Sequence, residues 1–511
     1  MMLRDGITTS LWQFNQPKYR PVNVPDISTV YDVAIIGGGI TGITTALLLQ
    51  KAGKKCIVIE KENLCYGTTG GTTAHLNSVV ETMPNTLLKD WGKEKATLIT
   101  QSLKDAIALV KSHVSFYNID CGFEETTAYF FSQTKDQSEG LDEVLEACRE
   151  VGLDATYSLS LPFNIPFDKV MEVKDHAKLN PVKYVYALAE AFEEAGGVIL
   201  QHTMVTGVED TDIRTVETEN GNFRAANLVY ATHIPPGVNL LHLRCVPMRS
   251  YVMAFTLQSK KYPDVLAYDM YDPYHYIRSQ NIDGENYMIV GGEDHKTGES
   301  ANAEASFLRL ESYIRKHFDV DEIPFKWSAQ FFDSADGVPY IGNLPGHPGN
   351  IFVATGYCGN GITYSQVAAI VLRDMILEQE NPYIEIFNPN RLKPVAGFSS
   401  FIKHNVDVVK QFVGKWFDKE KLEEFVELAP GEGKVVKYEG EKIALYKDEH
   451  GELHAVDPIC THLKCQVSWN NAEKSWDCAC HGSRFSYDGK VLTGPADREL
   501  EKIAIRSLVE H

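Results

Sequence analysis

Short apolar runs and glycine-rich breaks alternate over the first 60 residues. Residues 32–36 and 55–59 are rich in β-branched side chains, as is typical of strands buried in a parallel sheet. Between them, residues 37–42 contain four glycines and residues 43–50 are mostly apolar, which predicts a tight turn followed by a helix. The order strand, turn, helix, strand predicts a βαβ unit of Rossmann-like type.

The glycine-rich turn has the spacing of a dinucleotide-binding fingerprint. Gly37 would make the tight turn, Gly39 would let the backbone approach a pyrophosphate, and Gly42 would let the helix pack closely on the strand. The first N–H groups of the helix would then face the phosphates. Glu60, which ends the second run, has the position that binds the ribose hydroxyls of an adenosine. A chance glycine-rich turn is the alternative, but the flanking strand, helix and acidic residue favour a dinucleotide site.

Two further segments bear on the choice between FAD and NAD. Residues 65–75 are dense in glycine and threonine, which suits a loop that wraps a large flat cofactor, although a flexible surface turn has the same composition. Residues 351–355 form another buried-strand run, followed by a turn with Gly356 and Gly361 and a helix through residue 375. That helix would offer a second set of N–H groups to an anionic or electron-rich atom. Only one dinucleotide fingerprint is present, so we expect no separate NAD(P)H domain.

Residues 31–375 resemble the D-amino-acid-oxidase-like family of FAD oxidoreductases, which includes glycine oxidase and the sarcosine and dimethylglycine dehydrogenases. The resemblance rests on the glycine-rich start with Glu60, on residues 327–342 with their Asp-Gly-Val-Pro motif, and on residues 353–361. It implies an α/β fold with a Rossmann-like FAD-binding part and a mixed-sheet substrate domain. The FAD-binding residues that it implies are Gly37, Gly39, Ile40, Thr41, Gly42, Glu60, Lys61, Gly67, Thr68, Thr69, Thr73, Ala74, Val205, Thr232, Gly356, Gly361, Ile362 and Thr363.

The resemblance also bears on how FAD is attached. Dimethylglycine-dehydrogenase-like members tether FAD through a histidine in a Gly-Thr-Thr-x-His context, and Gly71 has that position here. We therefore expect non-covalent FAD, with His75 or Cys65 as the alternative points of attachment.

The middle of the chain predicts helices and a substrate-binding sheet. Residues 90–118 and 141–151 have the apolar spacing of amphipathic helices. Residues 246–257, 274–278 and 287–291 read as strands, the last two joined as a hairpin. Side chains on these strands that could bind a substrate carboxylate are Arg249, Tyr251, Tyr274, Tyr276 and Arg278, and the alternative is that they are ordinary strand residues. The arginine-proline pair that the family often has before its Asp-Gly-x-Pro motif is replaced by Phe331 and Phe332, which weakens the case for an amino-acid substrate.

Four of the ten cysteines crowd into one short stretch near the end of the chain. Cys460 and His462 form a Cys-x-His pair, and Cys478 and His481 form a Cys-x-x-His pair, with 15 residues (463–477) between the two pairs. Two thiolates and two imidazoles on adjacent loops are the ligand set of a Rieske [2Fe–2S] centre. A Cys₂His₂ zinc site is the competing interpretation.

The residues around these ligands resemble Rieske domains. The matching segments are Cys-Thr-His-Leu at 460–463, Cys-His-Gly-Ser at 480–483 and the later Gly494-Pro495. In the cytochrome-complex type, the two extra cysteines form a disulfide that clamps the cluster loops, and Cys465 and Cys480 have those positions here. The short β-like runs beyond residue 430 are those of a small all-β domain.

Composition and charge narrow the class of protein. The net charge of −20 disfavours nucleic acid as a partner, because an acidic surface repels phosphates. The longest apolar stretch is broken by glycines, so we expect no transmembrane segment. The first residues lack the apolar core of a secretory signal, so we expect a cytoplasmic protein.

The expected organisation is an N-terminal extension (1–30), an FAD domain (31–395; FAD-binding parts 31–85, 165–240 and 328–380, substrate parts 86–164 and 241–327), a linker helix (396–425) and a Rieske domain (426–511).

Together these features predict an FAD-dependent dehydrogenase. We expect an amine or amino acid to reduce the flavin, and the electrons to leave through the cluster to an external acceptor. Two alternatives stay open: the cluster feeds electrons into the flavin, or the enzyme is an O₂-using oxidase whose cluster is structural or a sensor. The linker helix could also bind a membrane surface instead of packing on the FAD domain.

Overall fold

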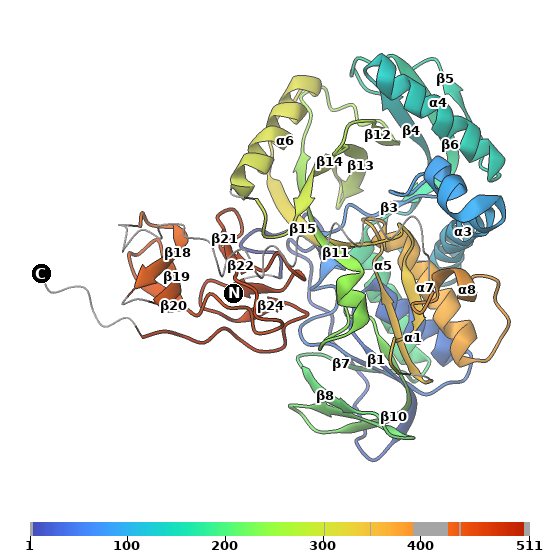
Figure 1. The fold of residues 1–511 in the computed structure, drawn as a ribbon. Coiled ribbons are helices and arrows are strands. Elements are labelled where there is room, and N and C mark those ends of the chain that lie inside the picture. Colours follow the sequence, from blue (N-terminus) through green and yellow to red (C-terminus); the bar gives the residue numbers. More distant parts are fainter. Residues whose placement is uncertain (1–3, 301, 348, 392–427, 439–440, 505–511) are drawn as a thin grey trace, which may run out of the picture.

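The computed structural model describes residues 4–300, 302–347, 349–391, 428–438 and 441–504. These residues form two large mixed sheets with flanking helices, followed by two small antiparallel sheets (Figure 1). The predicted linker helix, residues 396–425, lies outside the described residues.

The first large sheet is the predicted Rossmann-like one. Its strand order is β16-β17-β10-β1-β2-β7, with β9 and β8 continuing from β10, and the pairings among β17, β10, β1, β2 and β7 are parallel. Residues 33–36 of β1 and all of β2 are buried because both faces of the sheet are covered there, which is why these stretches are continuously apolar. The strands are β1 (Val30–Ile36), β2 (Cys56–Ile59), β7 (Val198–Leu200), β8 (Val205–Glu209), β9 (Arg214–Thr218), β10 (Phe223–Tyr230), β16 (Tyr340–Asn343) and β17 (Ile351–Thr355).

Helices pack on this sheet where the sequence placed them. Helix α1 (Ile40–Lys51) follows β1 after the glycine turn and packs against α5 (Pro181–Glu194) and α7 (Gly361–Ile376). Helix α3 (Pro84–Phe116) packs against α7 and α4 (Lys135–Glu150). Gly92 breaks α3 with a positive φ of 74°, so this region is two helical segments across a kink. The remaining helices are α2 (Thr68–Gly71), η1 (Leu240–Leu243), α6 (Ala303–His317) and α8 (Ile384–Phe387).

The second large sheet contains the strands that the sequence predicts for the substrate part. Its order is β15-β11-β14-β13-β12-β4-β6-β3, with β5 paired to β6. The predicted hairpin is present as β13 and β14, but its turn lies at residues 283–284 and its strands are longer than predicted. The strands are β3 (His75–Leu76), β4 (Glu124–Ser132), β5 (Ala155–Ser158), β6 (Lys169–Lys178), β11 (Cys245–Phe255), β12 (Leu266–Asp269), β13 (Tyr276–Ile282), β14 (Glu285–Lys296) and β15 (Phe325–Ser334).

The C-terminal part is all-β, as predicted. One antiparallel sheet contains β18 (Gly433–Tyr438), β19 (Glu441–Lys447) and β20 (Leu453–Val456). The other contains β21 (Ser468–Asn470), β22 (Ser475–Asp477), β23 (Arg484–Ser486) and β24 (Val491–Thr493). The second of these sheets lies next to β11 and β15 of the large sheet (Figure 1), and it contacts them through buried side chains.

The N-terminal extension lies between the two parts of the molecule. The Arg484 guanidinium of β23 donates to the carbonyl oxygen of Arg4 (2.9 Å), and the Arg249 guanidinium of β11 donates to the carbonyl oxygen of Asp5 (2.8 Å). Farther along, Trp12 is buried in the main core, and its indole N–H bonds the Thr72 carbonyl. The extension is therefore part of the fold and joins the two parts.

In the part of the chain that the structure describes, no helix combines the length and the apolar character needed to cross a lipid bilayer.

Candidate active site and metal centre

A cavity of about 390 Å³ begins at the glycine-rich turn after β1. Gly37 has a φ of +112°, and a Cβ atom there would lie 2.5 Å from the Ala231 carbonyl oxygen. A Cβ atom on Gly42 would lie 1.9 Å from the Gly37 carbonyl oxygen. Only glycine allows this close approach, which brings the first turn of α1 to the cavity wall. The N-cap residue of α1, Gly39, has no side chain to cap the helix, and the Ile40 N–H donates to the Thr69 hydroxyl (3.1 Å), which also lines the cavity.

Glu60 lies at the same end of the cavity. Its carboxylate accepts hydrogen bonds from the Gly38 N–H (2.6 Å) and the Glu62 N–H (2.8 Å), which hold it against the glycine turn. Burial raises the pKa of Glu60, because the charged form loses its contact with water. A ribose hydroxyl could bond this carboxylate, so the residues present fit an adenosine dinucleotide.

Most residues that the family resemblance implied for FAD line this cavity. Those on its wall are Gly37, Gly39, Ile40, Thr41, Glu60, Lys61, Gly67, Thr68, Thr69, Thr73, Val205, Thr232, Gly361 and Ile362. The other four implied residues do not line the cavity; they are Gly42, Ala74, Gly356 and Thr363. The Thr363 hydroxyl accepts a hydrogen bond from the N–H of Asn77 (3.1 Å), which does line the cavity.

The far end of the cavity lies under the second sheet and is rich in aromatic rings. Tyr268, Tyr274, Tyr276 and His75 line it, with ring-centroid distances of 5.4 Å between His75 and Tyr268 and 5.9 Å between Tyr274 and Tyr276. The His75 Nδ1 atom lies 2.7 Å from the Tyr268 hydroxyl. Burial and the nearby Arg278 lower the pKa of His75, so its imidazole is neutral.

The other predicted substrate residues lie elsewhere. The Arg249 guanidinium lies at the junction with the C-terminal part, 3.6 Å from the Glu473 carboxylate. Tyr251 is in an apolar cluster, with its hydroxyl 2.9 Å from His295 Nε2. Arg278 is buried and donates to the Thr73 (2.7 Å) and Ala74 (2.8 Å) carbonyl oxygens. Of the five candidates, Tyr274 and Tyr276 reach the cavity.

Two carboxyl groups at this end were not anticipated. Asp294 and Glu81 both line the cavity, and Glu81 is exposed at its surface. The Ser250 hydroxyl bonds the Asp294 carboxylate and lies 2.7 Å from the Tyr276 hydroxyl. Burial raises the pKa of Asp294 to about 8, and the negative charge of Glu81 adds to this effect.

The four predicted cluster ligands lie on two neighbouring loops of the C-terminal part. Cys460 and Cys478 are buried, and a hydrogen bond with Cys478 lowers the pKa of Cys460 to about 7. The His462 and His481 rings are 5.0 Å apart between centroids. The His462 Nδ1 atom is buried without a hydrogen-bond partner among the described residues, so it can bind a metal ion. This set of two thiols and two imidazoles fits a Rieske cluster.

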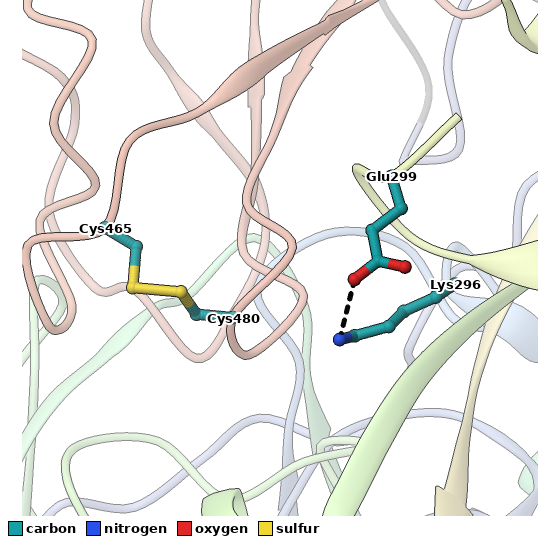
Figure 2. The surroundings of a disulfide bond; sticks show 4 residues. All are labelled: Lys296, Glu299, Cys465 and Cys480. Atoms are coloured by element: carbon teal, nitrogen blue, oxygen red, sulfur yellow. Dashed lines mark ion pairs between the residues drawn. A yellow bond between two sulfur atoms is a disulfide. The ribbon is translucent and has the colours of Figure 1, made fainter. Parts of the chain in front are cut away.

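The other two cysteines of the cluster region are joined to each other. Cys465 and Cys480 form a disulfide with an S–S distance of 2.13 Å (Figure 2). The Sγ atoms of Cys465, Cys478 and Cys480 lie within 4.8 Å of one another, and the disulfide leaves Cys478 as the thiol of this group. The same loop contacts the turn after β14, because a Cβ atom on Gly298 would lie 2.8 Å from the Ala479 nitrogen. The Lys296–Glu299 ion pair beside Gly298 faces the disulfide in Figure 2.

The two histidines of the metal centre lie against the part of the chain that precedes β11. The His462 Nε2 atom lies 3.1 Å from the Gly237 carbonyl oxygen, and the His462 ring packs edge-on against His242 at 4.7 Å. The Gln330 side chain, which lines the cavity, donates to the Gly482 carbonyl oxygen (2.9 Å). Residues 491–497, which include the end of β24, also line the cavity. A single cavity is thus bounded by the glycine turn and by the metal-binding part.

Comparisons with known proteins agree with this arrangement. A family model described as FAD dependent oxidoreductase matches residues 32–375, and a model described as Rieske [2Fe-2S] domain matches residues 419–504. The chain is 33% identical over 478 residues to a putative Rieske 2Fe-2S iron-sulfur protein, YhfW, from Bacillus subtilis (strain 168), covering 93% of this chain and 94% of that protein. It is 21% identical over 383 residues to the gamma-glutamylputrescine oxidoreductase of Escherichia coli (strain K12), covering 72% of this chain and 89% of that protein.

A solved structure shares the fold of the first part. Glycine oxidase from Geobacillus kaustophilus superposes with a TM-score of 0.58 at 20% sequence identity, covering 71% of this chain and 99% of that one. The predicted fold class and both predicted cofactors are therefore confirmed. The chain belongs to the DAO family of FAD-dependent oxidoreductases and carries a Rieske [2Fe–2S] domain after its FAD domain.

Proposed function

We propose that this enzyme oxidises a CH–NH group of a small amine or amino acid and passes the electrons through its own cluster to an external acceptor. Forming a C=N bond from a CH–NH group releases two electrons and two protons. When bound, FAD accepts the electron pair and the [2Fe–2S] cluster accepts one electron at a time. Two one-electron transfers to the external acceptor therefore complete each turnover, and the protons leave to solvent.

The choice of CH–NH chemistry is supported by the relatives and by the cavity. The E. coli relative is named as an oxidoreductase of gamma-glutamylputrescine, and the superposed structure is a glycine oxidase. The cavity end under the second sheet is closed by aromatic rings and held by β11, β13 and β14, so a small substrate there would be shielded from water.

The observation that carries the electron route is the cavity shared by both parts of the molecule. Residues 491–497 of the Rieske domain line the same cavity as the glycine turn. Between them, the Thr68 hydroxyl donates to the Gln330 carbonyl oxygen (3.1 Å), and the Gln330 side chain donates to Gly482, next to the ligand His481. These contacts supply a short path from the FAD-binding loop to the cluster.

The route is tested with the complete holoprotein and without a substrate. The flavin is reduced by a light flash in the presence of EDTA under anaerobic conditions, and the cluster is followed by electron paramagnetic resonance. We expect loss of reduced flavin to match the appearance of reduced cluster, at a rate independent of protein concentration. Gln330→Ala should slow this transfer. Asn471→Ala, which removes a different contact between the two parts, should not.

Three outcomes would contradict the electron route. One is a cluster that stays oxidised, and another is a rate proportional to protein concentration, which would mean transfer between molecules. The third is undiminished O₂ consumption with substrate in a Cys478→Ser variant that lacks the cluster, which would favour an oxidase.

A further inference from the structure

The substrate end of the cavity holds two carboxyl groups without a matching cation. Of the described residues that line the cavity, Glu81 and Asp294 are the carboxylates near the tyrosines, and the lysines and arginines are Arg4 and Lys61. The Arg4 guanidinium bonds the Thr68 hydroxyl and lies 2.8 Å from His233 Nδ1. The Lys61 ammonium donates to the Val491 carbonyl (3.0 Å). Both cations therefore belong to the nucleotide end.

The charges nearest to the two carboxyl groups are also negative. The negative charges of Glu81 and Glu293 raise the pKa of Asp294, and that of Asp272 raises the pKa of Glu81. A carboxyl group withdrawn from water without a cation, as that of Asp294 is, is unfavourable as an anion. A cationic ligand would relieve this cost, whereas a ligand carboxylate would add a third like charge.

The rings of Tyr268, Tyr274 and Tyr276 form a wall beside the carboxyl groups, and this tyrosine wall also suits a cation. Ring centroids of Tyr268 and Tyr274 lie 6.3 Å apart, and those of Tyr274 and Tyr276 lie 5.9 Å apart. Electron-rich ring faces beside carboxylates attract alkylammonium groups. The contacts from Asp294 through Ser250 to Tyr276 place the carboxylate on one side of this wall.

An uncharged hydrogen-bonding group lies on the other side of the wall. His75 is 9% exposed, its ring is 5.8 Å from that of Tyr276, and its Nε2 atom has no hydrogen-bond partner among the described residues. A neutral imidazole at this position can bond an uncharged amine. The cavity thus offers one place for an ammonium group and another for a neutral nitrogen.

We propose that the substrate is a di- or polyamine without a carboxylate, with one ammonium group bound by Glu81 and Asp294 against the tyrosine wall. Oxidation of an amine requires the nitrogen lone pair, so the nitrogen held as ammonium cannot be the one that reacts. A second, uncharged nitrogen must therefore reach the flavin, beside the neutral imidazole of His75, which lines the cavity. This inference rests on the proposed oxidation of CH–NH groups and specifies its substrate class.

The first test compares three compounds of one length with the anaerobic holoenzyme: 1,4-diaminobutane, 1-aminobutane and 4-aminobutanoate, with glycine, N-methylglycine and proline as the amino-acid panel. We expect 1,4-diaminobutane to bleach the flavin at a half-saturating concentration at least tenfold below that of 1-aminobutane. The compounds with a carboxylate should not bleach it.

The second test removes the charges singly. Glu81→Gln and Asp294→Asn should each raise the half-saturating concentration of the diamine about tenfold or more, because each removes one partner of the ammonium group. The monoamine should be affected much less. Glu293→Gln is the matched control, since Glu293 is the neighbour of Asp294 on β14 but pairs with Arg309 (2.5 Å). Flavin absorbance of each variant checks that FAD is still bound.

A binding measurement makes the inference independent of turnover. Tetramethylammonium has no lone pair and is not oxidised, so it should perturb the flavin spectrum of the oxidised holoenzyme, and acetate should not. Loss of this perturbation in Glu81→Gln and Asp294→Asn is expected, and its persistence in both would overturn the inference.

The failure of this inference is distinguishable from the failure of the proposed function. If amino acids bleach the flavin and diamines do not, the substrate class is wrong and CH–NH oxidation stands. If no compound bleaches a flavin that dithionite reduces, the proposed function is wrong, and tetramethylammonium binding alone then decides whether the carboxyl pair is a cation site.

Discussion

At the residue scale, Asp294 couples the cavity to the stability of the fold. Burial, reinforced by Glu81, raises the pKa of Asp294 from 3.8 to about 8. Between about pH 4 and about pH 8, the unfolded chain therefore loses this proton while the folded protein keeps it. The contribution of Asp294 to stability is complete below pH 3.8 and is lost as the pH rises through about 8.

This linkage predicts how one substitution changes the pH dependence. The wild-type free energy of unfolding, measured in urea, should fall as the pH rises from about 4 to about 8, and Asp294→Asn should remove on the order of 2–4 kcal/mol of that fall. Glu293→Gln should keep the wild-type slope. If the free energy of unfolding of wild type and of Asp294→Asn changed with pH in parallel, Asp294 would have the same pKa in the folded and unfolded states.

At the element scale, helix α1 depends on one glycine for its position. A Cβ atom on Gly42 would lie 1.9 Å from the Gly37 carbonyl, a backbone atom that cannot rotate away. Displacing α1 moves the N–H groups of its first turn away from the phosphate position. The same contact therefore controls both the packing of α1 and the binding of FAD.

A Gly42→Ala variant should therefore disturb both the packing of α1 and the binding of FAD. We expect its stability to fall by about 1–3 kcal/mol, as for other overpacked sites, and its ratio of bound flavin to protein to fall with it. Gly140→Ala in α4 is the control, since the nearest atom to its Cβ is Met270 Cε at 3.9 Å. That variant should keep its flavin and gain up to about 1 kcal/mol, because alanine favours helix over glycine. Full flavin content in Gly42→Ala would contradict the assigned packing role.

At the scale of the whole molecule, a buried charge network joins the FAD and Rieske parts. Arg249 and Glu473 are fully buried and 3.6 Å apart, and Arg484 lies 2.9 Å from Asp477. Asp5 of the N-terminal extension approaches both arginines. The Ser328 hydroxyl also bonds Glu473, so charges from three distant parts of the chain meet here.

This network predicts that the two parts unfold together in the wild-type protein. Glu473→Gln leaves Arg249 buried with less compensating charge, so we expect about 3–5 kcal/mol lower stability. We also expect flavin release and loss of the cluster's visible circular dichroism to become separate transitions on heating. Arg315→Ala removes an exposed pair with Glu311 and should change stability by less than about 0.5 kcal/mol. Coincident transitions in Glu473→Gln would show that the network does not couple the parts.

The sequence by itself determined what depends on local spacing. The glycine turn, the two Cys/His pairs and the alternation of strands and helices are set by residues close together in the chain, and they were sufficient to predict the fold class and both cofactors. The periodicity also predicted the β13–β14 hairpin, but it made the turn too long, because a period of two does not mark where a strand ends.

Only the tertiary structure decided which side chains meet across the chain. Arg249 on a strand is a reasonable ligand for a carboxylate, yet Asp5 and Glu473, more than 200 residues away on either side, hold it at the domain junction. Glu81 and Asp294 are unremarkable in the sequence and become neighbours only because the segment after β3 and strand β14 line the same cavity. The physical reason is that charge and burial act through space, and no local pattern records which distant element will lie alongside.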